Sequence, residues 1–407
     1  MTKACYVGVA GKARKVKKIY TGIANKARKV KKAYVGVAGK ARKVKKIYTG
    51  IANKARKVKK AYVGVGGKAR LFYSADQKLG YYGTVTALSQ ARCELAATTV
   101  GTYGLFSSSF NANTNPLPTV DAYNTSLVRS TPTALSQARN GLAATTVGTY
   151  GLFGGGGDLF ILSSSFYATV DAYNTSLVRS TPTALSQARC ELAATTVGTY
   201  GLFGGGFNKS SDLATVDAYN TSLVRSTPTA LSQARDYLAA TTVGNYGLFG
   251  GGFNAKTGLL ATVDAYNTSL VRSTTTALSQ ARYGLAATTV GSYGLFGGGF
   301  DNKSSSFSTV DAYNTSLVRS TPTALSQARN GLAATTVGSY GLFGGGVNKS
   351  SFSTVDAYNT SLVRSTPTAL SQARDSLAAT TVGNYGLFGG GFNRSSYLAT
   401  VDVYNLV

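Results

Sequence analysis

The sequence predicts an all-β protein built from repeats, and three observations carry this prediction. The motifs ALSQAR and TVDAYN (TVDVYN in the last copy) each occur seven times after residue 80, about 45–50 residues apart. Each unit contains four short segments rich in β-branched and aromatic residues, which favour strands. The region also begins and ends partway through a unit. Repeats of this length with four strands each are typical of propeller blades, so the sequence predicts a seven-bladed β-propeller.

The four strands are expected in the same order in every blade. In the second copy they are LAATTV (142–147), YGLF (150–153), TVDAYN (169–174) and SLVRSTPTAL (176–185). Residues 81–90 resemble a fourth strand without the three before it, and the unit that ends at residues 400–407 lacks its fourth strand. The two ends are therefore expected to complete the seventh blade together, which removes an open strand edge.

A second repeat, with a period of 14 residues, fills the N-terminal segment. Residues 1–70 hold 23 Lys and Arg and no Asp or Glu, whereas the whole chain has 42 and 15. Units such as YVGVAGKARKVKKI combine glycine with tyrosine and β-branched residues, which favours strands over helix. We therefore expect KARKVKKIYTGI to be a strand of an antiparallel β-meander. Because Gly and Asn tolerate positive φ, short turns are expected at Ala10-Gly11, Ala24-Asn25, Ala38-Gly39 and Ala52-Asn53.

The predicted meander carries too much like charge to be stable alone. Lys and Arg are expected to face Lys and Arg across its strands, which is destabilising, and its apolar content is small. Such a segment needs an anionic partner, further copies of itself or a surface, so we expect it to dock the chain onto an acidic assembly. The expected docking residues are Lys12, Arg14, Lys26, Arg28, Lys40, Arg42, Lys54 and Arg56. The alternative is a solvated basic arm that is largely disordered alone.

The composition excludes many catalytic mechanisms. The chain has no histidine, which rules out an imidazole base, a histidine-ligated metal and a Ser-His-Asp triad. Its three cysteines are odd in number and lack metal-ligand spacing. We expect no catalytic residue, no metal and no cofactor. No apolar run approaches about 18 residues, so no membrane span is expected. The expected domains are the basic repeats (1–70), a linker (71–80) and the propeller (81–407).

The longer repeat has the pattern RNGLAATTVGTYGLFGGG…TVDAYN, with a glycine pair after the second strand and a tyrosine ending the third. In these features it resembles a kelch repeat, over residues 81–407. The tryptophan usual in kelch repeats is absent, and Leu127 or Val128 is expected to take its place. In the first copy serines at 107–109 replace the glycine run. The N-terminal repeats, over residues 6–70, resemble short basic repeats in tail and appendage proteins of tailed phages and prophages.

Differences between the seven copies fall at two places. The segment between GLF and TVD runs from 10 residues (344–353) to 15 (154–168). The pair after ALSQAR also changes; it is Asn140-Gly141 in the second copy. Both places are expected to open on one face of the propeller, and loops on a rigid scaffold usually carry binding. The expected ligand-binding residues are Glu94, Asn140, Glu191, Asp236, Tyr237, Tyr283, Asn330 and Asp375. Drift at tolerant turns is the alternative explanation.

The Asp of TVDAYN and the Arg of ALSQAR recur without change in all seven copies. A ring of seven carboxylates could be catalytic, and a ring of seven arginines could bind an anion near the axis. Because both residues repeat identically in structural segments, we expect them to pair with each other inside each blade instead.

Taken together, these features predict a non-enzymatic structural protein of a virion or extracellular appendage, made in the cytoplasm without a signal peptide. Residues 1–70 would bind other virion or appendage proteins, with homo-oligomers in the assembly. The propeller loops would bind a host-surface glycan or protein, with Tyr237 and Tyr283 stacking on sugar rings. The alternative is nucleic-acid binding through the basic repeats, with the propeller as a structural cap. A propeller enzyme is disfavoured because its catalytic candidates repeat sevenfold.

Overall fold

The structure is a computed structural model of the 407-residue chain. It describes residues 78–407 apart from 108–109, 112–115, 159–164, 302 and 304. Before residue 78 it describes only the backbone of six short strands. The chain divides into two compact units, residues 1–78 with Val407 and residues 79–406.

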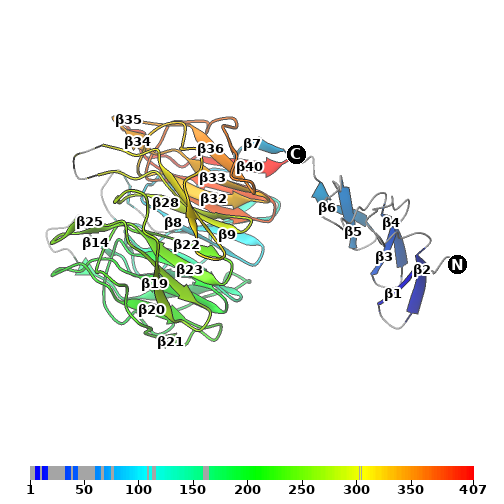
Figure 1. Ribbon diagram of the computed structural model, residues 1–407, viewed down its shortest axis with the longest axis horizontal. Helices are drawn as coiled ribbons and strands as arrows, with labels where there is room; N and C mark the ends of the chain where they lie inside the picture. The colour runs from blue at the N-terminus through cyan, green and yellow to red at the C-terminus, as the bar shows by residue number, and fades with distance from the viewer. Residues whose placement is uncertain are drawn as a thin grey trace. The chain divides into compact units, whose positions relative to one another are not determined.

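The described part of the N-terminal unit consists of three antiparallel hairpins (Figure 1). They are β1 (Cys5–Val9) with β2 (Lys12–Val16), β3 (Ala33–Val37) with β4 (Lys40–Val44), and β5 (Lys60–Val65) with β6 (Lys68–Ser74). The pairs Val9–Lys12 and Val37–Lys40 leave two residues between the strands, at the predicted turns 10–11 and 38–39. The turns predicted at 24–25 and 52–53 lie outside the described residues. The described strands therefore pair as separate hairpins and not as one meander.

The expectation that Lys and Arg face one another is wrong for the described strand pairs. Arg14 lies opposite Val7 and Lys12 lies opposite Val9, and the β3–β4 hairpin repeats both pairs. The reason is that the connection falls between YVGV and KARK, so the apolar half of each repeat pairs with the basic half. Of the predicted docking residues, β2 and β4 contain Lys12, Arg14, Lys40 and Arg42. Those outside the described residues are Lys26, Arg28, Lys54 and Arg56.

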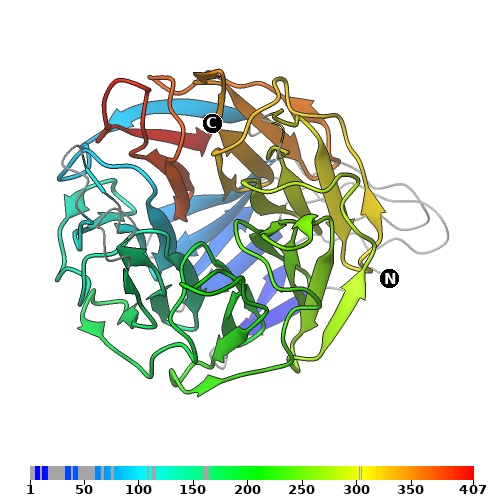
Figure 2. The same cartoon turned by 90° about the vertical axis from the view of Figure 1, so that its left-hand side faces the viewer.

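Residues 79–406 form seven four-stranded antiparallel sheets arranged in a ring, so the predicted seven-bladed propeller is confirmed (Figure 2). The innermost strands, all AATTV, are β8 (Ala96–Val100), β12 (Ala143–Val147), β18 (Ala193–Val197), β22 (Ala239–Val243), β28 (Ala286–Val290), β32 (Ala333–Val337) and β38 (Ala378–Val382). The second strands are β9 (Tyr103–Ser107), β13 (Tyr150–Gly154), β19 (Tyr200–Gly204), β23 (Tyr246–Gly250), β29 (Tyr293–Gly297), β33 (Tyr340–Gly344) and β39 (Tyr385–Gly389).

The two outer strands of each blade complete the sheets. The third strands are β10 (Val120–Asn124), β16 (Val170–Tyr173), β20 (Val216–Tyr219), β26 (Val263–Asn267), β30 (Val310–Asn314), β36 (Val355–Asn359) and β40 (Val401–Leu406). The fourth strands are β11 (Arg129–Ser130), β17 (Arg179–Ser180), β21 (Arg225–Ser226), β27 (Arg272–Thr275), β31 (Arg319–Ser320), β37 (Arg364–Ser365) and β7 (Leu79–Val85). Three small sheets lie in the loops: β14 (Gly157–Asp158) with β15 (Ser165–Phe166), β24 (Phe253–Asn254) with β25 (Gly258–Leu259), and β34 (Val347–Asn348) with β35 (Ser350–Ser351).

Most fourth strands are shorter than the sequence predicted, and proline explains the difference. Strand β31 contains only Arg319–Ser320, and Pro322 follows two residues later. Proline has no N–H and cannot extend the ladder. In blade 4 the equivalent residue is Thr275, and there β27 continues to Thr275, which pairs with Val263.

The predicted closure of the ring is confirmed. Strand β7 pairs antiparallel with β40 and forms the outer edge of blade 7, so the two ends of the propeller share one sheet (Figure 2).

The hydrophobic core consists of clusters between neighbouring blades. In one of them Val197 and Leu202 of blade 3 pack with Phe249 and Tyr266 of blade 4, and all four side chains are fully buried. The second strand must approach the preceding blade closely. A β-carbon at Gly247 would lie 3.0 Å from Thr195 Cγ2, which explains glycine at this position.

Only one of the two residues expected to replace the kelch tryptophan is buried. Leu127 is 8% exposed and belongs to a core cluster, whereas Val128 is 59% exposed. The suggestion of Val128 was therefore wrong.

Two threonines from each innermost strand line the propeller axis. Thr146 Oγ1 donates to the carbonyl of Thr99 at 2.6 Å, and Thr145 Oγ1 lies 3.0 Å from Thr196 Oγ1. Because Thr196 donates its own proton to the carbonyl of Thr146, Thr145 is the donor to Thr196. Both bonds recur at all seven blade junctions. They close a ring around a channel of about 260 Å³.

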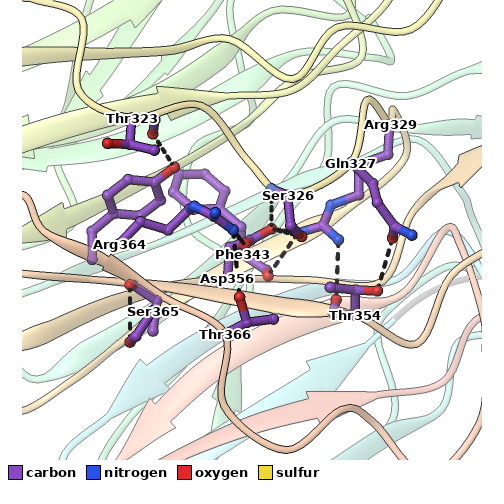
Figure 3. Close-up of polar contacts among 12 residues, drawn as sticks. Thr323, Ser326, Gln327, Arg329, Phe343, Thr354, Asp356, Arg364, Ser365 and Thr366 are labelled. Carbon is purple, nitrogen blue, oxygen red and sulfur yellow. Dashed lines mark hydrogen bonds and ion pairs between the residues drawn. The ribbon is translucent and has the colours of Figure 1, made fainter.

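Each of blades 1–6 holds a buried aspartate between two arginines, drawn for blade 6 in Figure 3. Asp356 accepts from Arg329 Nη2 and from Arg364 Nη1, both at 2.7 Å. Ser326 donates to the same carboxylate through its backbone N–H and its hydroxyl. Arg329 and Asp356 are completely buried, whereas the Arg364 side chain is 25% exposed. The predicted pairing of this Arg with this Asp is confirmed.

The ALSQAR segment joins two blades through this pair. The N–H of Arg329 donates to the carbonyl of Phe307, and its carbonyl accepts from Gly299; both partners belong to blade 5. Its guanidinium binds the carboxylate of blade 6. In blade 7 the tyrosine Tyr81 of β7 replaces the second arginine and donates to Asp402.

Replacing Arg329 with Met should lower the free energy of unfolding by about 3–5 kcal/mol, because it removes the buried partner of Asp356. Arg364→Met is the matched control and should cost less, since that side chain is partly exposed. Urea denaturation followed by circular dichroism measures both. Equal losses for the two variants would contradict a special role for the buried pair.

Candidate ligand-binding face

The two variable connections of each blade meet on one face of the propeller. The first residue of each variable pair forms an antiparallel bridge with a residue at the start of the loop between the second and third strands. The seven bridges are Cys93–Phe110, Asn140–Gly157, Cys190–Phe207, Asp236–Phe253, Tyr283–Phe300, Asn330–Val347 and Asp375–Phe392. The predicted shared face is therefore confirmed.

The second residues of the pairs form what we name the mouth ring. The N–H of Tyr237 donates to the carbonyl of Glu191 at 3.1 Å, and the N–H of Glu191 donates to Gly141 at 2.7 Å. Six such bonds join the seven residues Glu94, Gly141, Glu191, Tyr237, Gly284, Gly331 and Ser376. Equivalent residues of successive blades can lie one hydrogen bond apart only near the axis, where the blades converge. The mouth ring is therefore the centre of this face.

Every residue of the mouth ring has a positive φ. The values run from 47° at Tyr237 to 62° at Gly284. Glycine adopts this left-handed conformation freely, whereas other residues do so at a cost of about 1–3 kcal/mol. Glu94, Glu191, Tyr237 and Ser376 are nevertheless held there. The leucines that follow the Asn-Thr-Ser turns of the opposite face, such as Leu127 with φ 61°, share this conformation.

The predicted binding residues differ in exposure. Asn140, Asp236 and Asp375 occupy first positions and are buried. Glu94 and Tyr237 occupy second positions and are exposed, Tyr237 to 42%. The structure thus brings Glu94, Glu191 and Tyr237 together in the mouth ring and buries other predicted residues between the blades.

Tyr283 and Asn330 are partly used by the fold itself. The Tyr283 ring lies 4.0 Å from that of Phe300 between centroids, and 6.0 Å from that of Tyr237. The amide nitrogen of Asn330 donates to Ser306 Oγ and to the carbonyl of Val347. Of the two predicted stacking tyrosines, Tyr237 therefore presents the more exposed ring.

The mouth ring carries two carboxyl groups that resist ionisation. Burial and the charges of Glu94 and Asp236 raise the pKa of Glu191 to about 8. Desolvation and the charge of Asp375 raise the pKa of Glu94 to about 7. Glycine at 141 gives the Glu191 carboxyl group its space, because a β-carbon there would come within 2.7 Å of Oε1. A change at one pair therefore depends on the residue in the neighbouring pair.

A groove of about 540 Å³ lies on the same face, among the loops of blades 2, 3 and 4. Its lining includes Phe166, Phe207, Phe253, Lys209, Asp212 and Asp236. The rings of Phe166 and Phe207 are 5.5 Å apart and meet edge to face. Burial and the charge of Asp212 raise the pKa of Asp236 to about 7. The groove thus combines apolar rings with two carboxyl groups and an amine.

Of these lining residues, only Asp236 was predicted from the sequence. The available signal for Phe207 and Phe253 was the phenylalanine that follows the glycine run in four copies, written GGGF. For Phe166 the sequence offered no signal, because its loop is the longest of the seven. The signal for Asp212 was its alignment with Tyr397, since GGGFNKSSDLA (204–214) and GGGFNRSSYLA (389–399) have equal length.

The opposite face has a structural reason to be constant. A β-carbon at Gly101, where φ is 55°, would meet Thr175 Cγ2 of the next blade at 2.8 Å. Gly148 and Thr221 repeat this contact one blade further on. The hairpin glycines therefore pack against the Asn-Thr-Ser turns of the next blade, such as residues 174–176. A larger residue in place of the glycine would clash, and a smaller one in place of the threonine would leave a gap between the blades.

The fold and this face define a seven-bladed β-propeller with four-stranded blades closed by both ends of the domain. A similar solved structure is that of YjhT, with a TM-score of 0.51 and 10% sequence identity. The similarity covers 78% of this chain and 95% of that one, and it shows the shared fold. No protein-family model and no curated protein matches the chain.

Neither a membrane-spanning helix nor a metal-binding cluster is found among the described residues. None of their elements is a helix long and apolar enough to cross a membrane. In the same residues, no three His, Cys, Asp or Glu side chains are grouped so that they could hold a metal ion.

Asp236→Asn should raise the melting temperature by several degrees at pH 8 and by much less at pH 5. In the folded chain the pKa of about 7 lies above the ordinary value of 3.8, so the ionised carboxylate costs stability above pH 7. This cost disappears as the pH falls towards 3.8. Differential scanning calorimetry at both pH values measures the effect. Asp375→Asn is the control: it weakens two serine hydrogen bonds and should lower the melting temperature at both. A loss of stability in Asp236→Asn at pH 8 would contradict the assignment.

Proposed function

We propose that the protein is a non-enzymatic, kelch-like propeller of a virion or extracellular appendage, and that it binds a host-surface ligand through the mouth ring and the groove. The observation that carries this proposal is the distribution of change among the seven copies. The buried Arg, Asp and Thr residues of the scaffold repeat without change, whereas the variable pairs and loops meet on one face.

The variety of side chains at the strained positions of the mouth ring supports a binding role for this face, because the leucines strained in the same way on the opposite face do not vary. Glu94, Glu191 and Tyr237 keep a left-handed conformation that Gly141 would adopt without cost. Retention of larger side chains at a strained position fits contacts that they make outside the fold.

The kelch-like assignment rests on the second and third strands. Gly155 and Gly156, which follow β13, have φ values of 73° and 100°, so this glycine pair turns the chain where other residues would be strained. The buried Tyr173 at the end of β16 donates from its hydroxyl to the carbonyl of Thr133 at 2.7 Å.

The basic repeats give the chain a separate means of attachment. With 23 Lys and Arg and no acidic residue, residues 1–70 would bind an acidic surface of neighbouring virion or appendage proteins. Attachment and ligand binding would then be carried by different parts of the chain, and homo-oligomers in the assembly would multiply the weak contacts of each copy.

Replacing all seven variable pairs with Gly-Ser should abolish binding of the fluorescent full-length chain to a panel of bacterial cells. The variant should fold, because the first position contributes a backbone bridge and Ser376 already occupies the second with φ 53°. Flow cytometry measures binding. Val178→Ser, a change of an exposed valine outside the variable connections, is the control and should bind normally. Undiminished binding by the Gly-Ser variant would refute the proposal.

A second candidate function, nucleic-acid binding, is favoured by the charge of residues 1–70 alone. If this function is correct, the full-length chain should retard DNA or RNA in an electrophoretic mobility-shift assay at low salt, and the affinity should fall steeply as the salt concentration increases. A chain lacking residues 1–70 is the control and should not shift either nucleic acid. If the full-length chain gives no shift at low salt, this second function is excluded.

A further inference from the structure

Two of the seven variable pairs begin with aspartate, and among the described residues other side chains donate hydrogen bonds to Asp375 but not to Asp236 Oδ1. Asp375 Oδ2 accepts from Ser351 Oγ at 2.7 Å, and its Oδ1 accepts from Ser376 Oγ at 3.0 Å. Asp236 is 6% exposed, and its Oδ1 is buried without a hydrogen-bond partner. A buried carboxylate oxygen without a donor is costly, so Asp236 is held in an unsatisfied state.

The residue that corresponds to Ser351 is different in blade 3, the blade before Asp236. In the loop of blade 6, Ser351 forms a β-bridge with Val347. In the loop of blade 3, Asp212 forms the equivalent β-bridge with Phe207, so the two residues occupy equivalent positions. An ionised carboxylate accepts hydrogen bonds and cannot donate. Asp212 Oδ2 is itself occupied by the N–H of Ala255 at 2.7 Å. The hydroxyl group present in blade 6 is therefore missing beside Asp236.

The groove lies where this hydroxyl is missing. Asp236 forms part of its lining, together with Phe166, Phe207 and Lys209. Its volume of about 540 Å³ falls in the range of about 300–1,000 Å³ that is usual for small-molecule sites. Rotation about χ2 of an aspartate is broad and exchanges its two oxygens, so an unsatisfied oxygen can turn towards a ligand.

We infer that this groove binds a neutral saccharide, one of whose hydroxyl groups donates to Asp236 as Ser351 donates to Asp375. This inference rests on the proposed function and names the ligand class. A sugar ring offers an apolar face to the phenylalanines and hydroxyls that both donate and accept. Lys209 supplies a donor for the accepting hydroxyls and disfavours a purely cationic ligand. Asp212 and Asp236 repel acidic sugars.

A glycan array probed with the labelled full-length chain tests the inference. The array carries glucose-, galactose-, mannose- and N-acetylglucosamine-terminated glycans, sialylated and glucuronate-terminated glycans, and an oligolysine peptide. The wild-type chain should bind neutral glycans only. Asp236→Asn should weaken that binding about tenfold, because a neutral amide oxygen replaces a charged acceptor. Val178→Ser, an exposed position outside the variable connections and the groove, is the control and should bind like the wild type.

Asp212→Ser provides a second variant that separates binding from folding. It places a hydroxyl beside Asp236, as Ser351 lies beside Asp375, and should weaken glycan binding while the unfolding transition is kept. If Asp236→Asn and Asp212→Ser bind neutral glycans as well as the wild type does, the groove is not the saccharide site. The proposed function is then unaffected. The same holds if the chain binds cells but only sialylated glycans, only oligolysine or nothing on the array. A wild-type chain that binds neither cells nor the array overturns both.

Discussion

The buried ion pair between Arg329 and Asp356, repeated at each blade junction, is the interaction on which the rest of the propeller depends. Neither charge is exposed, so the loss of one leaves the other uncompensated in the interior. The same arginine holds the preceding blade through its backbone, so the pair couples two blades at once. This coupling explains why ALSQAR and TVDAYN change so little along the chain.

The axis and the opposite face leave little further freedom. Every threonine hydroxyl around the axis is committed to a neighbouring blade, so replacing Thr145 or Thr146 would break a ring that has no spare donor. On the opposite face, Gly101 and Thr175 are in contact between blades. Differences between the copies are concentrated in the variable pairs and the loops beside them, and both lie on one face.

Much of this architecture follows from the sequence, because repetition reveals strand order and closure directly. The split blade at Leu79–Val85 and the pairing of Arg329 with Asp356 were both predicted, since each follows from the position of a motif. What the sequence could not supply depends on neighbouring segments. The burial of Asp236 and the exposure of Tyr237 depend on a positive φ and on the adjacent blade. The groove depends on loops of unequal length. In the N-terminal hairpins, the register rather than the composition places Arg14 opposite Val7.

A site that occurs at one blade of a sevenfold scaffold requires a residue that differs from its equivalents in the other blades. Here the differing residue is Asp212, which occupies the position of Ser351. Where a serine of one blade satisfies a polar residue of the next, as Ser351 does for Asp375, the position is closed to ligands. Where that serine becomes Asp212, the same scaffold leaves Asp236 buried, unsatisfied and beside a groove. Burial and the nearby charge of Asp212 raise the pKa of Asp236, and the same surroundings leave its Oδ1 without a partner in the chain. A binding site of this kind would therefore lower the stability of the unliganded chain, because the chain gives up a hydrogen bond with itself, and a bound ligand would restore that stability.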